Sequence, residues 1–147
     1  MEEQGPRFQV FHFSDPRQQR IYEELRNVVG PGPAAFFRDA CWLIANPHQL
    51  TSTAHLVAHL LRELESALRA VFLPVAKKGA GDSAGSASQK SEILAILRSL
   101  GIPEDAPQAR AWFELVENLH KLAHRRGLEA PRSHEEIIDL WEQSQVL

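Results

Sequence analysis

The chain has 147 residues, a formal net charge of −3 and 44% hydrophobic residues, which suits one folded domain around a single core. Its one cysteine, Cys41, excludes an internal disulfide and any zinc site made of cysteine pairs. Cys41 stands in an apolar stretch, which indicates a core residue rather than a nucleophile. The first residues form no apolar signal core, and no apolar run reaches the roughly 20 residues that span a bilayer. We therefore expect a soluble, cytoplasmic protein without a membrane partner.

Two helices are predicted before residue 48. Asp15 followed by Pro16 is typical of a helix start, because the aspartate can cap and the proline lacks an N–H that would be unpaired there. The glycines and proline at 30–32 should end this helix. A second helix is expected from Pro33 to the Asn-Pro pair at 46–47, and its apolar character predicts that it is buried.

The third predicted helix has the clearest periodicity in the chain. Thr51 or Ser52 should cap it, and the proline at 74 should end it. Its apolar residues follow the three- and four-residue spacing of one helix face: Val57, Leu61, Leu64, Leu68 and Val71. The hydrophilic stretch 77–89, rich in glycine and serine, is predicted to be a flexible loop inserted within one domain.

Three further helices are predicted after this loop. They cover 88–100 and 105–127, and a last helix opens with the capping-box pair Ser133 and Glu136. The sequence thus predicts an all-α, up-and-down bundle of about five to six helices in a single domain, 1–147. Because the last helix reaches the end of the chain without a terminating signal, we interpret the chain as the N-terminal module of a longer protein.

Four histidines form two pairs with the same spacing. His55 and His59 lie four residues apart in the third helix, and His120 and His124 lie four apart in the fifth. Residues at this spacing share a helix face. A helical wheel places the first pair, with Arg62, opposite the core stripe, and the second pair beside its own stripe. Both faces are therefore predicted to line a groove, a dimer interface or solvent.

The segment from Leu119 to Arg125 (LHKLAHR) resembles the signature helix of the HEPN superfamily. That superfamily consists of small all-α domains, often dimeric, many of which are RNA-cleaving toxins or defence effectors. The resemblance covers roughly residues 50–147 and implies that His124 is the family histidine and His120 the polar residue of the motif. Leu119 stands where the family has arginine. The resemblance thus implies a HEPN-like association or effector module of a prokaryotic defence or toxin-type system, with weak or no nuclease activity.

Three alternatives stay open. In an active, metal-independent ribonuclease, His124 and His120 would share the acid and base roles and Arg62 would supply a cation at the phosphate. A structural adaptor would bind a partner protein through its helices. A metal-binding bundle would use His55, His59, His120 and His124 as ligands. Apart from that metal, no cofactor is predicted, and the expected partners are a second copy of the chain or another protein, with RNA as a further candidate.

Overall fold

The computed structural model describes residues 11–80, 88–123 and 133–144. Within these ranges all regular secondary structure is helical, which confirms the predicted all-α bundle. In chain order the elements are α1 (Pro16–Glu24), the π-helical turn η1 (Leu25–Val29), α2 (Pro31–Ala45), α3 (Thr53–Ala80), α4 (Gln89–Ser99), α5 (Pro107–Ala123) and α6 (His134–Ser144). Among the described helices, none combines the length and the apolar character needed to cross a membrane.

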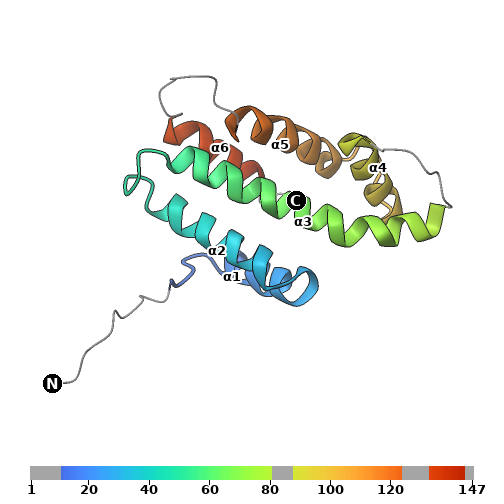
Figure 1. The fold of residues 1–147 in the computed structure, drawn as a ribbon, viewed down its shortest axis with the longest axis horizontal. Helices are drawn as coiled ribbons and strands as arrows, with labels where there is room; N and C mark the ends of the chain where they lie inside the picture. The colour runs from blue at the N-terminus through green and yellow to red at the C-terminus, as the bar shows by residue number, and fades with distance from the viewer. Residues whose placement is uncertain (1–10, 81–87, 124–132, 145–147) are drawn as a thin grey trace.

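Helix α3 is the central element of the bundle. It contacts α2, α4, α5 and α6, and Figure 1 shows α1 and α2 on one side of it and α5 and α6 on the other. The main core fills the space between these helices and includes Phe37, Val57, Leu61, Leu115, Leu119, Ile137 and Trp141. A smaller apolar cluster between α4 and α5 is built on Ile93, Leu97 and Ala109. The four- and three-residue spacing predicted for the third helix therefore does mark its buried face.

Three of the predicted helix starts are confirmed by capping hydrogen bonds. The side chains of Asp15, Ser88 and Ser133 each accept a hydrogen bond from a backbone N–H two or three residues further on, at 2.8, 3.2 and 3.4 Å. Each bond satisfies one of the N–H groups that the first turn of a helix leaves without an intrahelical acceptor. These local contacts explain why the starts could be read from the sequence.

The prediction that the third helix ends before Pro74 is wrong. Helix α3 continues through this proline to Ala80, so residues 77–80 of the predicted loop are helical. A proline inside a helix removes one hydrogen bond and costs about 3 kcal/mol. Ala76, two residues beyond it, is buried, so the helix still packs against the rest of the protein after the proline. Of the remaining loop residues, 81–87 lie outside the described residues, while Ser88 caps α4 and Gln89 is its first residue. The predicted extension of the fifth helix from 124 to 127 also lies outside them.

The turn between α1 and α2 is tighter than predicted. The last turn before it, η1, is π-helical, and the N–H of Gly30 donates to the carbonyl oxygen of Leu25 at 2.9 Å. Gly30 has a φ of 142°, in the region that glycine adopts readily and other residues do not. The chain therefore reverses within one residue, and α2 begins at Pro31 rather than at Pro33.

Cys41 lies in the core, as predicted. Burial, together with the negative charge of Asp15, raises the pKa of its thiol to about 12. Since the thiolate is the reactive form, a rise from 9.0 to about 12 lowers the thiolate fraction at pH 8 by about 1000-fold. We expect a disulfide reagent such as DTNB to leave the folded protein unlabelled over minutes and to label one thiol at once in guanidinium. Rapid labelling of the folded protein would contradict this burial.

Candidate functional site

An exposed strip of α3 lies between two hollows. His59, Glu63 and Ser66 are exposed along this strip. On its α2 side is a shallow groove of about 380 Å³, which we call the α2–α3 groove. Its lining residues are Asp39, Trp42, Leu43, Leu56, His59, Leu60 and Glu63. The apolar side chains thus form most of the groove, and two carboxylates and an imidazole also line it.

Trp42 is the main exposed apolar side chain of the α2–α3 groove. It is 41% exposed, and Leu56 on the facing helix is 39% exposed. The apolar composition of the second helix predicted that it is buried on all sides. This prediction is wrong for the face that carries Trp42. Large aromatic side chains in a groove are typical of protein contact surfaces, because they remove much apolar area from water when covered.

The second hollow lies on the other side of the strip, between α3 and α5, and has a volume of about 170 Å³. We call it the α3–α5 hollow. It is lined by Arg62, Glu63, Glu65, Ser66, Arg69, Gln89, Val116, Leu119 and His120. Arg62 and His120, two of the three residues assigned to the predicted nuclease site, therefore line the same hollow. A guanidinium can bind a phosphate with two parallel hydrogen bonds, and an imidazole can transfer a proton near neutral pH.

The other predicted histidines are distributed differently. His59 lines the α2–α3 groove rather than the α3–α5 hollow, and His55 is half-buried, with its Nε2 atom inside the protein instead of facing away from the core. His124 lies outside the described residues. Within the ranges that the structure describes, no three or more His, Cys, Asp or Glu side chains form a group able to hold a metal ion.

Leu119, at the position of the family arginine, is a core residue. It is 1% exposed and belongs to the main apolar cluster. Its neighbour His120 is exposed. At this point of α5, His120 therefore faces outward and Leu119 faces inward.

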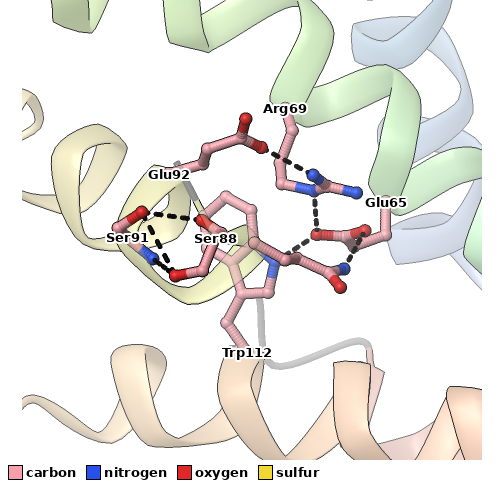
Figure 2. Close-up of polar contacts among 7 residues, drawn as sticks. Glu65, Arg69, Ser88, Ser91, Glu92 and Trp112 are labelled. Atoms are coloured by element: carbon pink, nitrogen blue, oxygen red, sulfur yellow. Dashed lines mark hydrogen bonds and ion pairs between the residues drawn. The ribbon is translucent and has the colours of Figure 1, made fainter. Parts of the chain in front are cut away.

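A network of charged side chains borders the α3–α5 hollow (Figure 2). Glu65 of α3 is only 6% exposed. One of its carboxylate oxygens accepts hydrogen bonds from Arg69 Nε at 2.8 Å and from Trp112 Nε1 at 3.0 Å, and the other accepts from Gln89 at 3.3 Å. Arg69 also donates to Glu92 of α4 at 2.7 Å. Glu65 thus joins α3, α4 and α5 at one point.

This network raises the pKa of Arg69. Burial by itself would lower the pKa of Arg69, but its hydrogen bonds and charge attraction to Glu65 and Glu92 outweigh that effect and raise it. The network is not among the features predicted from the sequence, although a signal was present. Glu65 stands four residues after Leu61 and three before Leu68, at the edge of the core stripe, where a carboxylate needs a partner.

Comparisons with protein-family models, with curated proteins and with solved structures found no match for this chain. What the site can do is therefore judged from its own residues. An apolar groove suited to a protein contact lies on one side of the α3 strip, and a cation and an imidazole line the hollow on the other side.

Proposed function

We propose that this chain is a HEPN-like helical association module of a prokaryotic defence or toxin-type system, with weak or no nuclease activity. One observation carries the proposal. The half-exposed Trp42 opens an apolar groove beside the α3–α5 hollow, while Leu119 fills the place of the family arginine from inside the core. The exposed residues thus favour contact with another protein surface over RNA cleavage.

A second copy of the chain is the proposed occupant of the α2–α3 groove. Charges of both signs surround the groove: Asp39 and Glu63 line it, Arg38 pairs with Asp39 at 3.3 Å, and Arg62 lies next to Glu63 in the chain. In a two-fold contact the same patch meets itself, so a patch that carries both signs can place each charge opposite its counterpart. The apolar floor would then be covered on both copies.

Replacing Trp42 by serine should weaken this association. Buried tryptophans at interfaces typically contribute about 2 kcal/mol or more, which corresponds to a dissociation constant raised by about 30-fold. Sedimentation equilibrium over a range of concentrations measures it. Val75→Ser is the matched control, because Val75 is also exposed but does not line the groove. A wild-type chain that stays monomeric at every concentration would contradict binding of a second copy in the groove. It would favour the alternative in which the chain is a structural adaptor for a different partner protein.

The active ribonuclease is the second candidate function, because Arg62 and His120 line one hollow. Under our proposal, labelled RNA incubated with the protein and a chelator is cleaved no faster than the buffer background. Cleavage that is lost in His120→Ala, His124→Ala and Arg62→Ala, and kept in Arg98→Ala, would support the ribonuclease instead. Arg98 is the control because it is exposed and pairs with Glu104, away from the hollow.

A further inference from the structure

We propose that His48 and His134 form a two-histidine binding site for a divalent transition-metal ion of the zinc class. His48 lies in the connection between α2 and α3, and His134 is the first residue of α6. Their ring centroids are 5.2 Å apart, and the rings are tilted by 45°. Figure 1 shows the α2–α3 connection and the start of α6 at the same end of the bundle. Neither residue belongs to the histidine pairs discussed above.

The distance between the two rings matches shared coordination. With Zn–N bonds of about 2.0–2.1 Å, the ion lies roughly 3.2 Å from each ring centroid, and a tetrahedral angle then separates the centroids by about 5.2 Å. The structure has the same separation, 5.2 Å. An ion between the rings would therefore need the ring nitrogens to turn toward it, without a change in the distance between the rings.

The backbone on each side of the pair is held in place. The hydroxyl of Thr53, which is fully buried, lies 3.0 Å from the carbonyl oxygen of Pro47 and 2.9 Å from that of Leu50, so its one proton is shared between them or donated to either. This contact holds the segment that contains His48. On the other side, Ile137 is completely buried and anchors the first turn of α6 in the core. Ligands fixed before binding lose less conformational freedom when the ion arrives.

The pair supplies two protein ligands, and the described residues add no third side chain to form a larger metal group. Water would complete the coordination of the ion. Such a site differs from a closed structural zinc site, which has four protein ligands. Because the two histidines come from different elements, a bound ion would link the α2–α3 connection to α6. Binding to the folded state alone would then stabilise the bundle.

Titration of the whole chain with zinc chloride tests the proposal. Calorimetry should give one zinc ion per chain for the wild type. The melting temperature should rise when zinc is added and fall back to its zinc-free value when EDTA removes the ion. His48→Asn and His134→Asn should each weaken zinc binding by about tenfold or more, since losing even an outer-shell partner of a metal site costs 10–100-fold. Each variant should also lose the zinc-dependent rise in melting temperature.

His59→Asn and His120→Asn are the matched controls, since both histidines are exposed and line other hollows. They should bind zinc as the wild type does. Circular dichroism without zinc checks that every variant is folded. Wild-type protein that binds no zinc at millimolar concentration, or binding that persists in both His48→Asn and His134→Asn, would overturn the site. The outcome is independent of the association through the α2–α3 groove.

Discussion

Replacing Glu65 by alanine is expected to lower the free energy of unfolding by about 3 kcal/mol or more. The carboxylate is buried and accepts hydrogen bonds from Arg69, Gln89 and Trp112. Its removal leaves the indole N–H without its acceptor and Arg69 with Glu92 as its remaining ion-pair partner. Arg69 is only partly buried and keeps its ion pair with Glu92. The cost therefore comes mainly from the N–H donors of Trp112 and Gln89, which lose their acceptor at about 1–3 kcal/mol each. Urea unfolding followed by circular dichroism measures the change.

Two companion variants show how much of the effect comes from losing a carboxylate on α3 and how much from losing the hydrogen bond of Trp112. Glu63→Ala removes a carboxylate from the exposed face of the same helix, so it should change the free energy of unfolding by about 0.5 kcal/mol or less. Trp112→Phe keeps an aromatic ring but loses the N–H donor and part of the ring volume, which should cost about 1–2 kcal/mol or more. An effect of Glu65→Ala as small as that of Glu63→Ala would contradict the network in Figure 2.

Replacing Leu119 by arginine is expected to prevent stable folding and not to create a nuclease. In the sequence this change completes the HEPN-like motif. In the structure Leu119 is 1% exposed within the main apolar cluster. Burying a charge there costs several kcal/mol even after relaxation, a large part of the roughly 5–15 kcal/mol that typically stabilise a domain. Circular dichroism and sedimentation should show unfolded or aggregated protein.

Leu119→Met is the matched control for this position. It conserves volume and polarity, so the protein should stay folded and lose less than about 1.5 kcal/mol of stability. A Leu119→Arg variant that folds like the wild type and cleaves RNA would contradict the inward position of this residue. It would also revive the ribonuclease as the function of the motif helix.

The elements that the sequence predicted well depend on neighbouring residues. The starts at Asp15, Ser88 and Ser133 follow from side chains that cap a turn two or three residues away. The buried face of α3 follows from an apolar spacing that any helix would align. The rule that fails is also local: Pro74 disfavours a helix, yet α3 continues beyond it to Ala80, and Ala76 is buried.

The candidate site was predictable only in part. His59 and His120 are exposed, as the helical wheel indicates, but they line different hollows because α2 and α5 pack against different sides of α3. Arg62 lines a hollow with His120 although about 58 residues separate them, a proximity that helix packing creates and that no spacing rule contains. His124 stays a prediction, since it lies outside the described residues.

The amino-acid sequence by itself determined an all-α chain, most helix starts and the apolar stripe of its central helix, because capping and periodicity act within a few residues. Only the tertiary structure decided that Glu65 is buried with partners on two other helices, that Trp42 opens a groove, and that His48 lies against His134. Each of these depends on which helix faces are brought together across long stretches of chain. Packing of the whole core sets that choice, and local residue patterns do not encode it.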